Sequence, residues 1–430
     1  MYIYRELQRN IENIFLSPKP QGLILTGVIG CGKTTVLEKI LEQYKDRFSI
    51  FHFSGDDIRF REAVASDSQY LVNYITSHTR KKALLFIDEV QKVEAVFDAI
   101  KIAFDKANVS FVVSGSNPDY LNTKAKHLLQ RRADLLFLLP LSLPEILSQN
   151  KLANLNVLDE FYSIVFESSK LGVLKINIEL NSDIEKICQE YLIYGGLPLS
   201  YLAQNSSAKL SEIRKVVERG FDQISNENDS VSELIRIELA KIHAREFAYQ
   251  GIFQRTRLRR RERINHVIDQ MINHGYLIRR IPLSLTETRR TYLSILSFID
   301  PGLVSYLTGN VDPTQDELGY RIEGIVHSRL DYRLRNEPLK MELGYFKPYQ
   351  IDSNGKVKYL PGEIDFLIRR GQRIIPIEVK YGSNRNNFDL RGIKKILVQE
   401  KNIPFGIILY GGIPCIDHSE RLLFWPWWFI

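Results

Sequence analysis

The chain has 430 residues, of which 44% are hydrophobic and 25% are charged, and its formal net charge at pH 7 is +7. A chain of this length is too long for one hydrophobic core and is expected to form about two to four domains, and its composition is ordinary for a soluble globular protein. The mildly basic balance permits a nucleic-acid partner without requiring one. The three cysteines show no disulfide or metal-ligand spacing, which favours a reducing, cytoplasmic setting.

Neither a signal peptide nor a membrane-spanning segment is expected. The N-terminus carries charged residues with no apolar core behind them, unlike a secretory signal. The longest apolar run, Leu135–Leu143, is broken by Pro140 and Ser142, and it is far shorter than the roughly 18 residues that cross a bilayer. We therefore expect no membrane partner.

Apolar runs alternate with helical patterns in the first third of the chain. Alternation of this kind predicts an α/β fold, with a parallel sheet and helices on both of its faces. The five runs that we expect to form the strands are Leu23–Thr26, Phe48–Phe53, Ala83–Ile87, Val109–Val113 and Leu135–Leu139.

A glycine-rich motif follows the first of these runs. Residues 27–34, GVIGCGKT, fit the P-loop pattern Gly-x4-Gly-Lys-Ser/Thr, and a segment with helical spacing follows. Strand, loop and helix in this order predict a phosphate site, where backbone amides converge on a nucleoside triphosphate. Lys33 would reach the β- and γ-phosphates and Thr34 would hold Mg²⁺, whereas the alternative is a glycine turn with an accidental Lys-Thr. The residues expected to contact ATP here are Gly27, Gly30, Gly32, Lys33, Thr34 and Thr35.

Two carboxylates, Asp88 and Glu89, end the third apolar run. An open α/β sheet binds its ligands at the carboxyl ends of its strands. Asp88 would hold Mg²⁺ through water, and Glu89 would orient and deprotonate the attacking water. A solvated acidic pair is the alternative, and the P-loop upstream favours the functional interpretation.

Polar and basic residues flank the last two predicted strands. Ser116 or Asn117 could read the γ-phosphate, and a turn that makes no contact is an equal alternative. One of Arg131 and Arg132 could reach the nucleotide of a neighbouring subunit as an arginine finger, although a solvated pair is as plausible. A finger that acts between subunits favours a homo-oligomer.

The order of these motifs, followed by residues 139–145, LPLSLPE, resembles the archaeal-type AAA+ ATPases. Gly195–Pro198, GGLP, is similar to that family's Gly-Gly-x-Pro signature, and residues 298–303, FIDPGL, are similar to its Asp-x-Gly-Leu. The resemblance covers essentially the whole chain. It implies an AAA+ core at 1–145, a helical lid at 146–230, a winged helix at 231–310, and a restriction-endonuclease-like α/β domain at 311–430. Two short strand patterns, at 275–278 and 291–295, agree with a winged helix.

A second candidate site lies in the C-terminal segment. The runs 362–368 and 374–380 predict a hairpin in which Asp365 begins one strand and Glu378 and Lys380 project from one face of the next. The arrangement resembles the PD-(D/E)xK nuclease motif. That resemblance implies that the two carboxylates hold Mg²⁺, with Mn²⁺ possible, and that the lysine positions or activates water. Glu323, on the preceding helix, fits the upstream acid and adds a metal contact. A structural ion pair is the alternative.

Six arginines crowd residues 255–263 against one acid, Glu262. Such a cluster in a winged helix predicts a surface that binds nucleic-acid phosphates, and a solvated helix that pairs with acids elsewhere is the alternative. The arginines are Arg255, Arg257, Arg259, Arg260, Arg261 and Arg263.

These motifs together lead to one preferred function and two alternatives. The preferred function is an ATP-hydrolysing AAA+ protein coupled to a metal-dependent nuclease that acts on DNA. The first alternative is an ATP-dependent DNA-binding or regulatory switch whose nuclease-like domain binds but does not cleave. The second is a protein-interaction switch that binds no nucleic acid.

Overall fold

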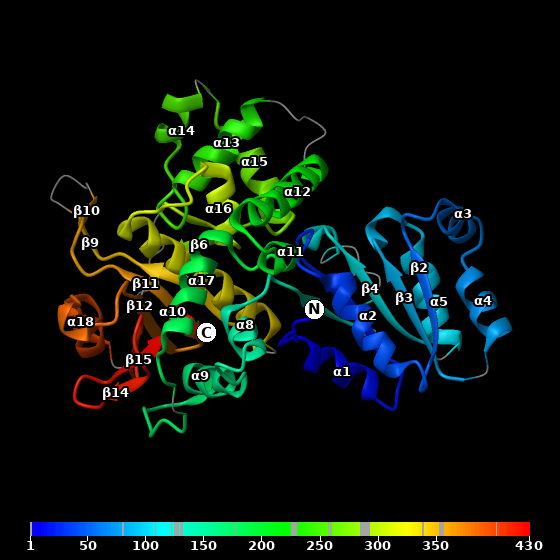
Figure 1. Ribbon diagram of the computed structural model, residues 1–430, viewed down its shortest axis with the longest axis horizontal. Coiled ribbons are helices and arrows are strands. Elements are labelled where there is room, and N and C mark those ends of the chain that lie inside the picture. Colours follow the sequence, from blue (N-terminus) through cyan, green and yellow to red (C-terminus); the bar gives the residue numbers. More distant parts are fainter. Residues whose placement is uncertain are drawn as a thin grey trace. The chain divides into compact units, whose positions relative to one another are not determined.

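The computed structural model (Figure 1) describes residues 2–79, 81–107, 109–121, 123, 129, 132–176, 178–224, 230–256, 258, 260–283, 293–337, 339–351, 357–400 and 402–430. The chain forms two compact units. Unit 1 comprises Met1–Leu141, Lys215–Asn226 and Asp269–Tyr276, and unit 2 comprises Ser142–Arg214, Glu227–Ile268 and Leu277–Ile430. Within the described residues no helix is both long and apolar enough to span a membrane.

Unit 1 is built on a five-stranded parallel sheet with the strand order β2-β3-β4-β1-β5. The predicted α/β fold with a parallel sheet is confirmed. The last strand begins and ends two residues earlier than the apolar run suggested. The strands are β1 (Gly22–Thr26), β2 (Ser49–Ser54), β3 (Ala83–Asp88), β4 (Ser110–Gly115) and β5 (Ala133–Phe137).

Helices cover both faces of this sheet (Figure 1). On one side α1 contacts α2 and β1, and on the other α5 packs with α3, α4 and β4 around a core of buried aliphatic and aromatic side chains. Strands β1 and β3 are apolar and buried along almost their whole length, as expected for the interior of a parallel sheet. The helices are α1 (Gln8–Leu16), α2 (Lys33–Tyr44), α3 (Ile58–Ser66), α4 (Tyr70–His78), η1 (Val90–Lys92), α5 (Val96–Ala107) and α6 (Pro118–Tyr120).

Two later segments return to unit 1 beside the glycine-rich loop. They are the C-terminal parts of α12 (Ser206–Ile224) and of α15 (Arg261–Asn273) with the residues that follow it. A Cβ atom at Gly30 would lie 2.6 Å from a methyl carbon of Val216, and one at Gly220 would lie 1.9 Å from the hydroxyl of Tyr276. The sequence placed these segments in a lid and a winged helix, whereas their contacts here are with unit 1.

Unit 2 contains an eight-stranded sheet with the order β14-β15-β13-β12-β11-β8-β6-β7. Strands β6 and β7, which the sequence assigned to a winged helix, are antiparallel to each other, and β6 runs parallel to β8. The predicted boundary at residue 310 therefore lies between strands of one sheet. The strands are β6 (Leu277–Pro282), β7 (Ile295–Phe298), β8 (Glu342–Phe346), β11 (Ile364–Arg370), β12 (Arg373–Val379), β13 (Gly406–Tyr410), β14 (Cys415–Asp417) and β15 (Leu422–Pro426); β9 (Tyr349–Ile351) and β10 (Val357–Tyr359) form a separate pair.

The helices of unit 2 include two that cover opposite faces of this sheet. Phe366 lies beside His327 of α17, whereas the next residue, Leu367, packs with Ile393 and Ile396 of α18. Successive residues of a strand point to opposite faces, so α17 and α18 lie on different sides. The helices are α8 (Leu143–Gln149), α9 (Asn156–Glu167), α10 (Ser182–Tyr194), α11 (Pro198–Leu202), α13 (Ser230–Lys241), α14 (Tyr249–Thr256), α16 (Pro301–Thr308), α17 (Gln315–Asn336) and α18 (Arg391–Gln399).

The glycine signature and the FIDPGL stretch meet in unit 2. The carboxylate of Asp300 accepts the backbone N–H of Gly196 at 2.7 Å and that of Gly302 at 2.8 Å, and it thereby caps α16. Gly195 has φ 69°, and a Cβ there would lie 1.9 Å from the Asp300 carboxylate. A side chain at Gly195 is therefore excluded, and this contact gives both signatures a structural role.

Candidate functional site

The P-loop has the backbone that its glycines predict. Gly30 has φ 77° and Gly32 has φ 96°, and Gly32 immediately precedes α2. The side chain of Lys33 is buried, and its Nζ donates to the carbonyl of Gly27 at 2.9 Å and to that of Val28 at 3.1 Å. The ammonium therefore lies within the loop, where a bound phosphate would replace these carbonyls as its partner.

Asp88 is the centre of a hydrogen-bond network at the carboxyl ends of β1, β3 and β4. It accepts the hydroxyl of Thr34 at 2.8 Å, the hydroxyl of Ser114, and the backbone N–H of Glu89 at 2.9 Å. Thr34 and Asp88 are thus brought together, as the magnesium prediction requires. Ser114 was not predicted, because a single small hydroxyl within an apolar strand carries no motif.

Glu89 occupies an unusual backbone conformation, with φ 51° and ψ 42°. Its carboxylate accepts the side-chain amide of Gln91 at 2.6 Å and the hydroxyl of Ser116 at 3.3 Å. Gln91 was missed by the sequence analysis, since nothing in the pattern marks it. The two contacts hold the carboxylate at the end of β3, where the proposed water-activating group is needed.

The second sensor candidate, Asn117, has a structural role. Its side-chain oxygen caps α6 by accepting the backbone N–H of Tyr120 at 3.0 Å, and its amide nitrogen lies 3.4 Å from Nε2 of His274. Thr35 is exposed on the first turn of α2. A role for Ser116 or Asn117 at the γ-phosphate stays a prediction.

The arginine-finger candidates are described only in part. Arg131 lies outside the described residues. Arg132 donates two hydrogen bonds of 2.9 Å to the carboxylate of Asp105 on α5, and this bidentate pair lowers the pKa of Asp105 and raises that of Arg132. Arg132 would have to leave Asp105 to reach a nucleotide on another subunit.

In unit 2 the predicted hairpin forms, with Phe366 of β11 opposite Ile377 of β12. The register brings Asp365 and Glu378 to the same end of the pair. Asp365 accepts the backbone N–H of Val379 at 2.7 Å, and Glu378 accepts Nζ of Lys380 at 2.7 Å. Among the described residues, the other carboxylate oxygen of Glu378 is buried and has no hydrogen-bond partner.

A buried arginine of β6 completes this cluster. Arg280 is 1% exposed, donates to the carbonyl of Asp365 at 2.6 Å, stacks on the ring of Phe366, and places a guanidinium nitrogen 3.6 Å from Glu323. Burial and the charge of Asp365 raise the pKa values of Glu323 and Glu378 to about 8. The site is therefore a set of desolvated acids beside two cations, Arg280 and Lys380.

Carboxylate oxygens are suitable ligands for a divalent cation, but the structure does not place three of the side chains that it describes around a common point. Across the described part of the chain, no group of three or more His, Cys, Asp or Glu side chains is placed to hold a metal ion. Mg²⁺ usually takes one or two protein carboxylates and keeps several waters. The unpartnered oxygen of Glu378, with Asp365 beside it, fits that smaller requirement.

The arginine cluster is described at four of its six positions. Arg260 and Arg261 are exposed, and Arg261 lies over the ring of Tyr249 at 4.8 Å. Stacking of this kind leaves the N–H edge of a guanidinium available for a phosphate. The described arginines are Arg255, Arg260, Arg261 and Arg263, while Arg257 and Arg259 lie outside the described residues.

Two of the cluster's arginines have partners within unit 2. Arg255 donates to the carboxylate of Glu238 at 2.5 Å, and the same carboxylate accepts Nζ of Lys241 at 2.7 Å. Arg263 donates to the hydroxyl of Ser232 at 3.0 Å. The carboxylate of Glu238 thus pairs with two cations, and the surface of the arginine cluster has an excess of positive charge.

Several solved structures are similar to the chain at low identity. Cdc6p from Pyrobaculum aerophilum is 14% identical over 72% of this chain and 96% of its own, with a TM-score of 0.28. AMPPCP-bound DnaA from Aquifex aeolicus is 16% identical over 63% and 89%, with a TM-score of 0.27. The Hsp104–ADP complex of S. cerevisiae is 16% identical over 64% and 39%, with a TM-score of 0.30. A search of curated proteins finds no match.

Two family models match parts of the sequence. The first, described as an AAA domain, matches residues 19–147, which contain the P-loop, Asp88 and Glu89. The second, described as a domain of unknown function (DUF4143), matches residues 324–429, which contain Asp365, Glu378 and Lys380. The match and the P-loop sheet agree, so the N-terminal part of this chain carries a nucleotide-binding AAA domain.

Proposed function

We propose that this protein hydrolyses ATP and couples the ATPase cycle to metal-dependent cleavage of DNA. The AAA domain match and the P-loop geometry support the ATPase half. The nuclease half rests on one observation, the buried carboxylate of Glu378, which is bonded to Lys380 through one oxygen and has an unpartnered second oxygen. Action in the cytoplasm as a homo-oligomer belongs to the same proposal.

In the ATPase site each side chain has a distinct task. Lys33 would exchange its loop carbonyls for phosphate oxygens, Thr34 and Asp88 would hold Mg²⁺, and Glu89 would orient the attacking water. The ion supplies neutralisation of the phosphate charge when it is bound. Gln91 and Ser116 would keep the Glu89 carboxylate aimed during this step.

In the nuclease site Asp365 and Glu378 would hold a divalent cation, with Glu323 as the adjacent acid. The cation supplies charge neutralisation at the scissile phosphate. Lys380, held by Glu378, would position water on the same side of the strand. Arg280 would offset the repulsion between the acids, because its buried guanidinium is held beside them by the carbonyl of Asp365.

Two observations favour the alternative of a DNA-binding switch that does not cut. Arg280 already supplies a buried positive charge to the acids, and in the described residues no three acidic or histidine side chains surround a common point as metal ligands would. Such a cluster would bind a nucleic acid through Lys380 and neighbouring cations and would not cleave it. Metal-dependent cleavage separates the two functions.

The test uses the full chain with supercoiled, linear and single-stranded DNA, with Mg²⁺ or Mn²⁺, and with or without ATP. We expect cleavage of at least one form that needs the metal, and a loss of about 100-fold or more in Lys380→Ala. Lys394→Ala is the matched control, because Lys394 is an exposed lysine of α18 paired with Glu420. Equal cleavage by the two variants would overturn the assignment of Lys380, and metal binding without any cleavage would favour the switch.

A further inference from the structure

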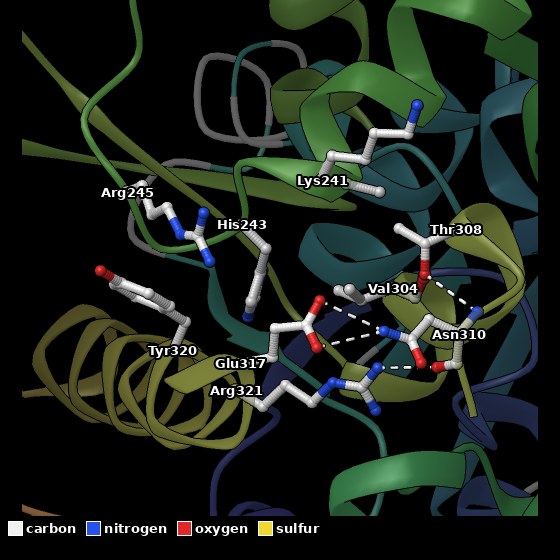
Figure 2. Close-up of a pocket in the computed structure, with 10 residues that line it drawn as sticks. Lys241, His243, Arg245, Val304, Thr308, Asn310, Glu317, Tyr320 and Arg321 are labelled. Atoms are coloured by element: carbon white, nitrogen blue, oxygen red, sulfur yellow. Dashed lines mark hydrogen bonds between the residues drawn. The ribbon is translucent and has the colours of Figure 1, made fainter. Parts of the chain in front are cut away.

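A cavity of about 260 Å³ in unit 2 lies apart from the residues of both candidate sites (Figure 2). Lys241, at the end of α13, and the turn that carries His243 and Arg245 form one wall. The opposite wall comes from the first turns of α17, with Glu317, Tyr320 and Arg321, and the end of α16 closes a third side. Neither nucleotide binding nor nuclease chemistry uses this cavity.

The lining of the cavity is positively charged. The lining holds three cations, Lys241, Arg245 and Arg321, and one carboxylate, Glu317, while Lys241 is also paired with Glu238 at 2.7 Å. Glu317 is also occupied by its own helix, because it accepts the backbone N–H of Thr314 at 2.8 Å in the capping box of α17. The cavity therefore favours an anion.

Arg321 is a fixed cation at the base of the cavity. It is 3% exposed and donates to the carbonyl of Leu192 and the hydroxyl of Ser305, each at 2.8 Å, and to the carbonyl of Asn310 at 2.9 Å. Among the residues that the structure describes, no carboxylate forms an ion pair with it. Its charge is thus held in place by neutral oxygens, and Glu317 on the same helix is the carboxylate that acts on it through its charge.

His243 contributes a buried donor that has no acceptor. The side chain is 5% exposed, and Nδ1 accepts the backbone N–H of Phe298 at 3.1 Å. Burial, together with the charges of Arg321 and Arg245, lowers the pKa of His243 to about 3, so the ring is neutral and its proton sits on Nε2. In the described part of the chain Nε2 has no partner. Nε2 faces the backbone of Gly324 on α17, because a Cβ atom there would lie 2.1 Å from it, so the neutral ring forms part of the wall.

The turn that presents His243 and Arg245 is strained. Ala244 between them has φ 59°, and its backbone N–H is held by the carbonyl of Leu296 at 2.9 Å. Non-glycine residues rarely adopt this region, and such strain concentrates at ligand sites. The turn places the exposed guanidinium of Arg245 4.1 Å from the ring of Tyr320. Stacking there uses the face of the guanidinium and leaves its N–H edge for a ligand.

We propose that this cavity binds a phosphate group, with Arg245 and Lys241 at its mouth and Arg321 as the inner cation. A phosphate carries negative charge, and its several oxygens suit cationic donors that arrive from different walls. The phosphate would belong either to a free nucleotide or to the end of a nucleic-acid strand. The proposal does not depend on the nuclease activity, because no residue of the cavity belongs to that site.

The test measures binding of inorganic phosphate, AMP, and a 5′-phosphorylated and a 5′-hydroxyl oligonucleotide by calorimetry or fluorescence anisotropy. The full chain is used with a non-hydrolysable ATP analogue and Mg²⁺ in excess, so that the P-loop is filled. We expect Lys241→Gln with Arg245→Gln to weaken binding of inorganic phosphate about tenfold or more. Arg391→Gln is the control, because Arg391 is 91% exposed and lies on α18, outside the cavity. Both replaced side chains are exposed, so the fold should persist, and circular dichroism checks this.

The four probes identify the source of the phosphate. Tighter binding of the 5′-phosphorylated than of the 5′-hydroxyl oligonucleotide supports the proposal and assigns a strand end. Saturable binding of AMP, with no difference between the two oligonucleotides, supports it and assigns a free nucleotide. Absence of saturable phosphate binding, or equal binding by the double variant and by Arg391→Gln, would overturn the proposal.

Discussion

Glu89 sits in a backbone conformation that non-glycine residues rarely adopt, with φ 51° and ψ 42°. Holding it there costs about 1–3 kcal/mol, and strain of this size persists only where surrounding contacts impose it. Gln91 and Ser116 supply such contacts by donating to its carboxylate. The neighbouring Asp88 instead accepts the hydroxyl of Thr34. The two adjacent acids therefore have separate surroundings, which agrees with separate roles.

Glu89→Gln should lower the rate of ATP hydrolysis about 100-fold or more while ATP still binds. The amide cannot accept a proton from water, whereas Lys33, Thr34 and Asp88 remain to hold the nucleotide and its ion. Phosphate release and binding of a fluorescent ATP analogue measure the two effects. Glu38→Gln, on the exposed face of α2, is the matched control. Hydrolysis at the wild-type rate in Glu89→Gln would assign water activation to another residue.

The residues that the sequence identified at these sites belong to short local patterns. Lys33 and Thr34 follow the glycines of one loop, and Asp88 ends an apolar strand, so each is recognisable from its neighbours in the chain. Arg280 is different, because it lies 85 residues from Asp365 in sequence and meets it only through the sheet. Asp105, the partner of Arg132, is hidden for the same reason.

Among the elements, α16 begins directly after a residue that hydrogen-bonds to a segment about 100 residues earlier in the chain. Asp300 caps this helix through Gly302 and also accepts the backbone N–H of Gly196, which follows α10. Burial raises the pKa of Asp300 to about 6, while the backbone donors oppose this shift. The carboxylate of Asp300 therefore caps α16 and connects it to the end of α10 through a hydrogen bond.

Asp300→Ala should destabilise unit 2 by about 2–4 kcal/mol, because a helix cap is lost and the N–H of Gly196 is left buried without an acceptor. Thr314→Ala, which removes the exposed cap of α17, should cost only about 1 kcal/mol. The folded-state pKa of Asp300 lies above its ordinary value of 3.8, so the stability that the carboxyl group contributes falls as pH rises through about 6. Calorimetric unfolding should therefore show a larger difference between wild type and Asp300→Ala at pH 5 than at pH 7. A difference that grows toward pH 7 would contradict the raised pKa.

In unit 2 the sequence predicts where strands lie along the chain but does not predict which strands distant in the sequence pair with one another. Apolar runs located β11 and β12 closely, because strand propensity and alternation are local properties. The same reasoning located β6 and β7 approximately and assigned them to a separate winged helix. Their pairing with β8 depends on tertiary contacts that no local pattern reports, so the sequence divided what the structure joins in one sheet.

For the whole molecule, two continuous helices belong to both compact units. Helix α12 passes from unit 2 to unit 1 after Arg214, and α15 does so after Ile268. Helix α15 begins in the arginine cluster with Arg261, and the residue just beyond its end, His274, lies 3.4 Å from Asn117 in the nucleotide-binding unit. A helix is stiff along its axis, so a change near the P-loop could reach the arginine surface through it.

If α12 and α15 couple the P-loop to the arginine cluster, ATP and DNA must alter each other's binding affinity by the same factor, because linkage is reciprocal. We expect a factor of about 5 or more when DNA binding is measured with and without a non-hydrolysable ATP analogue, and an equal factor when analogue binding is measured with and without DNA. Lys33→Ala should bind DNA as the analogue-free wild type does and should lose the response, whereas Lys39→Ala, on the exposed side of the same helix, should keep it. Neutralising Arg260 and Arg261 should weaken DNA binding and lower its salt dependence. A factor of 1 in both measurements, or a response that persists in Lys33→Ala, would show that the P-loop and the arginine cluster are not coupled through these helices.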